Sequence, residues 1–356
     1  MLEQLPHELM NHVISYIPEE YHFALRETTK GMSEHFRKSR TRRRLYSDNL
    51  HRAAYDGNLS LIKYIIKHKF EDTNDSANPA RTCGAAAGGG SLNVLKYLVE
   101  QGFAITNRAL AAAAYGGHVH IFRWIHEHFV DFRPGLLAGL GTGTLHAAAR
   151  GGHIETMEYL RGRGCRFSKR SSSVAAKAGR LHVLEYLLAC GAEFNSETCE
   201  AAVLGGGLDT LKWLRNLDPP CPWDTATFAT ACALGRVDIL DYAYAGGCPY
   251  EITREFTYKH YATVPGHLDV LRWLNEHECT FSVDDSLTAV RCGHLEIVKW
   301  LFELGCPFHP TTCNEAAHRG FTKILKYAHQ LGEPWVGMER YYHVHVMMYA
   351  RELGFV

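Results

Sequence analysis

The stretch AVRCGHLEIVKWLFELGCPF, Ala289 to Phe308, decides the fold, because its pattern recurs ten times along the chain of 356 residues. Each copy is aligned on a glycine that precedes an apolar segment, and the commonest spacing is 27 residues. Self-similarity at a fixed period is typical of stacked repeat architectures. The aligned glycines are Gly57, Gly90, Gly117, Gly152, Gly179, Gly206, Gly235, Gly266, Gly293 and Gly320.

Two further columns predict how the copies pack. Four residues before the glycine every copy has alanine, which indicates a close approach of two backbones, since a larger side chain would overpack. Seven residues after the glycine every copy has Tyr or Trp, and we expect these rings to supply the core. The alanines are Ala53, Ala86, Ala113, Ala148, Ala175, Ala202, Ala231, Ala262, Ala289 and Ala316, and the aromatics are Tyr64, Tyr97, Trp124, Tyr159, Tyr186, Trp213, Tyr242, Trp273, Trp300 and Tyr327.

Helix-end signals divide each copy into two helices. Eight copies have Ser, Thr, Asn or Asp eight residues before the glycine, and we interpret these as N-caps of a first helix. Six copies have a second glycine twelve residues after the first, which suits the left-handed end of a second helix. The N-cap candidates are Asn49, Thr82, Thr144, Ser171, Thr198, Thr227, Asp285 and Thr312, and the C-terminal glycines are Gly102, Gly164, Gly191, Gly247, Gly305 and Gly332.

A unit of this kind cannot bury its apolar face alone, so the prediction is an all-α solenoid of about ten helix-turn-helix repeats. TLHAAARGGHIETMEYL, Thr144 to Leu160, resembles the ankyrin family. Ankyrin units usually have about 33 residues, and the residues missing here lie where that family places its projecting fingers. We therefore expect shortened fingers in most repeats.

One first helix departs from its sister copies. REFTYKHY, Arg254 to Tyr261, replaces small residues by large ones. Exposed Tyr and Arg are favoured interface anchors, so we predict a target-binding patch here, and a merely repacked repeat is the alternative. The candidate residues are Arg254, Tyr258, Lys259, His260 and Tyr261.

Composition limits the classes of function. Lys+Arg and Asp+Glu are equal at 38 each, so the whole molecule has no field that attracts nucleic acid or an anionic membrane. No run approaches the ~18 apolar residues of a membrane span, and no secretion signal opens the chain. The eleven cysteines contain no CxxC pair and are expected to be reduced and packed. We expect an intracellular protein.

No pattern of residues predicts catalysis, a cofactor or a metal site. The 22 histidines include His118, His153, His267 and His294, which follow turn glycines, and we expect them to tie backbone together. HExxH, GxSxG and Walker-type motifs are absent. The basic run RKSRTRRR, Arg37 to Arg44, could serve nuclear import or phosphate binding, but no basic face elsewhere supports this, so a solvated junction is preferred.

The front of the chain has a different pattern. In LPHELMNHVISYIP, apolar residues recur at helical spacing before Pro18. With Leu25, Arg26 and Lys30, the segment resembles an F-box over Leu5 to about Arg37, although the usual tryptophan near its end is absent. The resemblance implies contact with a Skp-family adaptor through Leu5, Pro6, Glu8, Leu9, Ile14, Ile17 and Pro18.

Together these patterns predict residues 1–40 as an F-box-like segment, 41–48 as a basic junction, 49–336 as the solenoid and 337–356 as a C-terminal capping helix. The resemblance implies a non-enzymatic substrate receptor of a cullin-type ubiquitin ligase, monomeric outside its complex and cytoplasmic. The combination is similar to F-box/ankyrin proteins of amoebae and giant DNA viruses, where that cytoplasm would be the host's. The alternative is a plain ankyrin scaffold or masking protein, in which the front segment only caps the first repeat.

Overall fold

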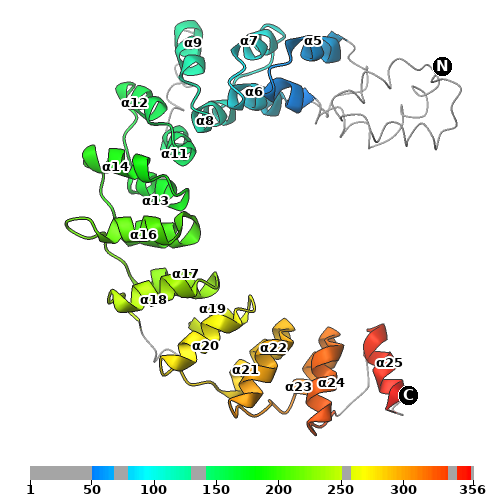
Figure 1. The fold of residues 1–356 in the computed structure, drawn as a ribbon. Helices are drawn as coiled ribbons and strands as arrows, with labels where there is room; N and C mark the ends of the chain where they lie inside the picture. The colour runs from blue at the N-terminus through cyan, green and yellow to red at the C-terminus, as the bar shows by residue number, and fades with distance from the viewer. Residues whose placement is uncertain (1–49, 68–78, 130–141, 251–257, 336–342, 354–356) are drawn as a thin grey trace, which may run out of the picture. The chain divides into compact units, whose positions relative to one another are not determined.

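The fold is known from a computed structural model, which describes residues 50–67, 79–129, 142–250, 258–335 and 343–353. In these ranges the chain is helical with no strand, and consecutive helices pair as helix-turn-helix units (Figure 1), which confirms the all-α repeat fold. No helix within these ranges is long and apolar enough to cross a membrane.

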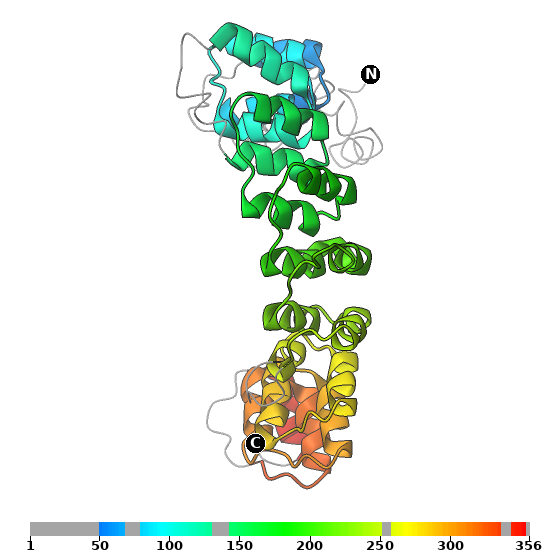
Figure 2. The same cartoon turned by 90° about the vertical axis from the view of Figure 1, so that its left-hand side faces the viewer.

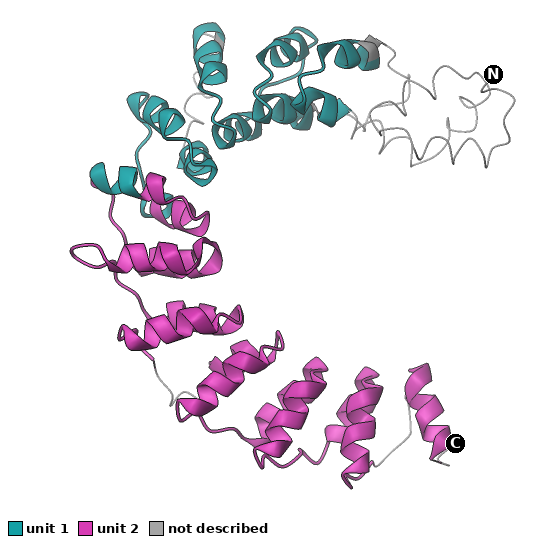
Figure 3. Ribbon diagram, in the orientation of Figure 1, with its two compact units in different colours: residues 1–171, 185–190 teal, residues 172–184, 191–356 magenta. Residues whose placement is uncertain are grey.

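Two compact units divide the chain: residues 1–171 with 185–190, and residues 172–184 with 191–356 (Figure 3). The first unit contains helical residues 50–55, α5 (Leu59–Lys67), α6 (Pro79–Gly88), α7 (Leu92–Glu100), α8 (Asn107–Tyr115), α9 (Val119–Phe129), α11 (Thr142–Gly151) and α12 (Ile154–Gly162). Residues of α13 (Lys169–Lys177) and α14 (Leu181–Ala189) are shared between the units.

The second unit continues the same pairing. Its helices are α15 (Ser196–Ala201), the π-helix η2 (Ala202–Gly206), α16 (Gly207–Arg215), α17 (Thr225–Ala233), α18 (Val237–Ala245), α19 (Tyr258–Thr263), α20 (Leu268–Glu276), α21 (Val283–Cys292), α22 (Leu295–Glu303), α23 (Thr312–Arg319), α24 (Thr322–Gln330) and α25 (Val344–Glu352). Within each unit the first helices contact one another in sequence, as α6, α8 and α11 do, and Figure 2 shows the two helices of each pair side by side.

The core lies between the helices of each pair and between neighbouring pairs. All ten column alanines are buried, nine of them with no exposed surface. From α7 onward, the second helices contribute adjacent buried side chains, for example Val94 and Leu95 or Ile239 and Leu240. The alanine prediction is confirmed, because the small alanine side chains let neighbouring first helices approach closely.

The aromatic column does not form the centre of the core, so that prediction is wrong in its placement. Of the nine rings whose side chains the structure describes, only Trp124 and Trp273 are buried, and the others are half-buried. Five of the half-buried rings pack at 5.2–6.2 Å between centroids against a ring nineteen residues earlier, in the linker before the first helix. The pairs are Phe167–Tyr186, Phe194–Trp213, Trp223–Tyr242, Phe281–Trp300 and Phe308–Tyr327. These contacts fold short linkers, such as residues 163–168, back on the repeat.

The predicted N-cap residues that the structure describes lie inside their helices, five of them at the third residue, whereas Thr312 is the first residue of α23. Thr198 and Asp285 are third residues of their helices, and the caps are Asn195 and Ser282. Ser282 N–H donates to the Asp285 carboxylate at 2.8 Å and Asn195 N–H to the Thr198 hydroxyl at 3.4 Å. The side chain therefore accepts from the cap backbone, as in a capping box, so the same residue types recur at the third position.

Glycines close both ends of the second helices as expected. The six C-terminal glycines have φ between +71° and +92°, and nine of the ten turn glycines are also left-handed. The exception is the sixth repeat, where Gly206 belongs to η2 and Gly207 takes φ +80°. Three consecutive glycines allow the turn to move by one residue there.

At the turns, histidine joins neighbouring repeats. His118, His267 and His294 each place Nε2 within 2.9–3.1 Å of a carbonyl oxygen of the preceding repeat, that of Gly88, Ala233 and Val264 respectively. The rings lie so close to the preceding turn glycines that a Cβ at Gly90 would stand 2.6 Å from His118. Three of the four predicted histidines therefore tie backbone together, and His153 lies against Gly117 in the same way.

A second glycine precedes the turn glycine in the first unit and sets the closest approach between repeats. A Cβ on Gly89 would overlap the Tyr55 carbonyl oxygen, whereas a Cβ on Gly143 of α11 would meet nothing within 4 Å. We expect Gly89→Ala to lower the free energy of unfolding by about 1–3 kcal/mol, because a backbone carbonyl must move. Gly143→Ala should be neutral or slightly stabilising, since alanine favours helix by up to about 1 kcal/mol. Urea unfolding of both variants checks this, and equal midpoints would contradict it.

The histidine contacts also predict a pH dependence. Burial lowers the pKa of His118, and the positive charge of His120 and His153 adds to this, although the bond to the Gly88 carbonyl opposes it. The ring is therefore neutral when folded, and its contribution to stability, present above the ordinary histidine pKa of about 6.5, is lost as the pH falls toward the folded pKa.

Phe321 occupies the equivalent place against Gly293, so His118→Phe is a substitution the architecture already accepts. At pH 7.5 it should cost about 1 kcal/mol for the lost hydrogen bond. Between pH 7.5 and 5.5 its melting temperature should fall less than that of the unaltered protein. A fall as steep as that of the unaltered protein would rule out His118 as a contributor.

Candidate functional site

Several predicted site residues lie outside the described ranges. The F-box-like positions Leu5, Pro6, Glu8, Leu9, Ile14, Ile17 and Pro18 are among them, as are Arg254 and the basic run Arg37 to Arg44. The remaining target-binding candidates all lie on α19.

Tyr258 has a packing role. Its side chain is 7% exposed, and its ring lies 5.1 Å from that of the fully buried Phe228 and 5.3 Å from that of Tyr250. It occupies the position that Thr or Ser fills in six sister repeats, so the large ring replaces small side chains in the core.

Lys259 is held within the repeat stack. Its Nζ lies 2.8 Å from Asp285 Oδ2 and donates to the Thr280 carbonyl oxygen at 3.0 Å, and both charged side chains are 16% exposed. The ammonium thereby joins α19 to the start of α21. Of the candidates on α19, His260 and Tyr261 are the two with exposed side chains.

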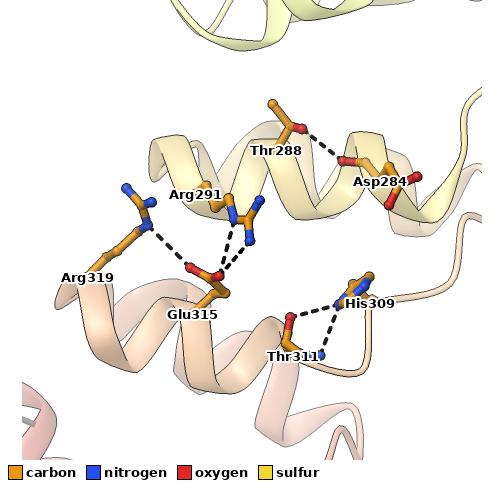
Figure 4. Close-up of polar contacts among 7 residues, drawn as sticks. All are labelled: Asp284, Thr288, Arg291, His309, Thr311, Glu315 and Arg319. Carbon is orange, nitrogen blue, oxygen red and sulfur yellow. Dashed lines mark hydrogen bonds and ion pairs between the residues drawn. The ribbon is translucent and has the colours of Figure 1, made fainter. Parts of the chain in front are cut away.

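Tyr261 belongs to a surface formed by first helices of the second unit. On the same side of neighbouring helices lie the exposed Val264, Arg291 and Arg319. Figure 4 shows Arg291 of α21 donating two hydrogen bonds to Glu315 Oε1 of α23, at 2.8 and 3.2 Å, while Arg319 donates to Oε2 at 3.4 Å. The Arg291 hydrogen bonds hold the pKa of the Glu315 carboxyl below its usual range, although burial opposes this. The carboxylate therefore fixes two exposed guanidinium groups on this surface.

The first unit presents a different first-helix surface, which we call the cationic face. Two repeat positions define it. The first position is nine residues before the turn glycine, where successive repeats have Arg81, Arg108, Gly143 and Arg170. The second is two residues before the turn glycine, where successive repeats have Tyr55, Gly88, Tyr115 and Arg150. Every Arg and Tyr of this set is exposed.

Contacts show that these positions adjoin across repeats. A Cβ on Gly84 would lie 3.9 Å from Arg108 Cγ, and one on Gly88 would lie 3.9 Å from the Tyr55 ring and 3.4 Å from Ala112 Cβ. The Arg150 guanidinium lies 5.8 Å from the centre of the Tyr115 ring. The pKa of His146 on α11 is lowered mainly by burial and also by the positive charge of Arg170.

Sequence reasoning missed the cationic face, and stated that no basic face existed. The balanced net charge conceals it, because the acids lie elsewhere in the chain. The available signal was the composition of the first helices alone: α6, α8 and α11 contain Arg81, Arg108 and Arg150 and no acidic residue.

The cysteines are free and mostly interior. Burial raises the pKa of the Cys83 and Cys313 thiols to about 11 and that of Cys248 to about 12. Within the part of the chain that the structure describes, no group of three or more His, Cys, Asp or Glu side chains is placed to hold a metal ion.

Comparison with known proteins identifies the repeat type. Residues 50–133 and 83–171 match the family model described as ankyrin repeats in three copies. Among solved structures, the crystal structure of the human ASB11 ankyrin repeat domain is 20% identical, with a TM-score of 0.31, covering 58% of this chain and 85% of that chain. Residues 50–171 therefore contain ankyrin repeats, an architecture that binds protein partners, and the first-helix surfaces are the candidate binding site.

The packing role of Lys259 can be tested against a matched pair in the same unit. Lys259→Met should lower the free energy of unfolding by about 1–3 kcal/mol, because it leaves the largely buried Asp285 carboxylate without its partner. Lys299→Met, which breaks a 2.9 Å pair with Glu296 between side chains 37% and 70% exposed, should change the free energy of unfolding by no more than about 0.5 kcal/mol. Equal losses in urea unfolding would contradict the assignment.

Proposed function

We propose that this protein is a substrate receptor of a cullin-type ubiquitin ligase, in which the repeats bind the target and the F-box-like segment binds a Skp-family adaptor. One structural observation carries the target-binding half. The first helices keep exposed Tyr and Arg side chains at fixed repeat positions, such as Tyr115 and Arg108, outside the buried core. Tyr and Arg are the side chains that most often anchor protein interfaces.

The adaptor-binding half is supported by the resemblance of Leu5 to about Arg37 to an F-box. Two or three short helices of about 40 residues bury too little surface to be stable alone. Such a segment requires a partner, and the proposal makes that partner the adaptor.

The mechanism needs no catalytic group in the repeats. Binding both adaptor and target on one chain raises the effective concentration of the target near the ubiquitin-charged enzyme, typically to the millimolar range for short connections. Orientation by a stiff repeat stack adds to this by limiting the geometries that the target samples. Under this proposal the protein acts in the cytoplasm and is a monomer outside its complex.

The test is adaptor binding by the full chain, compared with a Leu9→Asp, Ile14→Asp double variant. Two charges placed in an apolar contact should cost about 2 kcal/mol or more, a weakening of at least about thirtyfold. The melting temperature of the repeats should not change. Tyr115→Ala is the matched control, since it alters a repeat surface and should leave adaptor binding intact.

If the unaltered chain does not bind the adaptor, and the double variant instead lowers the melting temperature, the front segment is a cap on the first repeat. That outcome would reject the ligase role and favour the plain ankyrin scaffold.

A further inference from the structure

The cationic face has one sign of charge. Arg81 and Arg108 form no ion pair with any residue that the structure describes, and α6, α8 and α11 carry no acid. Among the described residues, Asp56, which follows helical residues 50–55, is already paired with Arg52 at 2.8 Å. Unpaired guanidinium groups at helix N-terminal turns, where the helix dipole is also positive, attract carboxylates.

Between the Arg positions and the Tyr positions the side chains are small. Five residues before the turn glycine stand Ala85, Ala112 and Ala147, each partly exposed, and Gly88 adjoins them. A methyl and glycine floor lets the backbone of another chain approach closely. Long side chains would flank that backbone on both sides. Arg81 and Arg108 would lie on one side, and Tyr115 and Arg150 on the other.

We infer that the cationic face binds an extended acidic segment of a partner protein, with carboxylates about three residues apart. Packed helices lie about 8–10 Å apart, and an extended chain advances about 3.3 Å per residue. One repeat therefore matches about three residues of ligand. Since Gly143 stands where an Arg would be, the third contact, with Arg170, falls about six residues beyond the second.

The inference rests on the proposed function in one respect: the acidic segment belongs to the target that the repeats bind.

An acidic peptide suits this face better than a nucleic acid. The floor consists of alanine and glycine, which offer no side-chain groups to read base edges, and Arg150 already lies against the Tyr115 ring, where a base would stack.

The test uses the full chain without adaptor and a fluorescent peptide of about 13 residues that repeats Glu-Ala-Ser and ends in Glu, so that carboxylates recur every third residue. Anisotropy at about 50 mM salt limits screening. Arg81→Glu, Arg108→Glu should weaken binding about tenfold or more. Lys63→Glu, Arg123→Glu is the control, because it makes the same charge change at exposed positions of the second helices α5 and α9 and should leave binding within about twofold.

Three results would overturn the inference. Equal weakening by the two double variants would show attraction to net charge rather than to this face. Tighter binding of an isomeric peptide whose glutamates are contiguous would reject the spacing, and tighter binding of an oligothymidylate of equal length would make the partner a nucleic acid. The Leu9→Asp, Ile14→Asp variant should bind the peptide normally, so failure here and failure of the ligase proposal are distinguishable.

Discussion

The turn contact between successive repeats is the constraint on which the rest of the structure depends. A left-handed glycine of one repeat faces an aromatic or imidazole ring of the next at six described junctions: Gly90 and His118, Gly117 and His153, Gly235 and His267, Gly266 and His294, Gly293 and Phe321, and Gly320 and His343. Only glycine combines the positive φ with room for the ring. Because the next repeat docks at this point, the alanines four residues earlier are brought into the core, and the separation of the first helices is fixed.

That constraint leaves other positions of the repeat free to vary. Residues nine, five and two before the turn glycine lie outside the buried alanine column, and they differ between the units. The first unit has Arg81, Arg108 and Tyr115 there, whereas the second has Tyr261, Arg291 and Glu315. The same scaffold therefore presents an unbalanced cationic surface in one unit and a mixed, internally paired surface in the other. In ankyrin repeats of this kind, partner choice can change without a change in fold.

The parts of the structure that could be predicted were those in which one residue type satisfies one steric requirement. Alanine at Ala148 and glycine at Gly152 have no substitutes, so the sequence pattern was decisive. Thr198 was misplaced because caps and third helix residues use the same hydroxyl and carboxylate chemistry in opposite directions. Tyr258 was misjudged as exposed because a ring suits an interface and a core equally, and only the neighbouring Phe228 decides between them. The cationic face was hidden because charge was summed over the chain rather than over one helix position.

The buried thiols can report local unfolding of individual repeats. Cys83, Cys232, Cys279 and Cys313 lie in different repeats, and burial raises the pKa of each. A thiol reacts as its thiolate and only when reached by reagent, so each cysteine can be alkylated only when its own repeat opens. Since repeat arrays open in segments rather than as a whole, the rates of alkylation along the chain rank the stabilities of successive repeats without any added label.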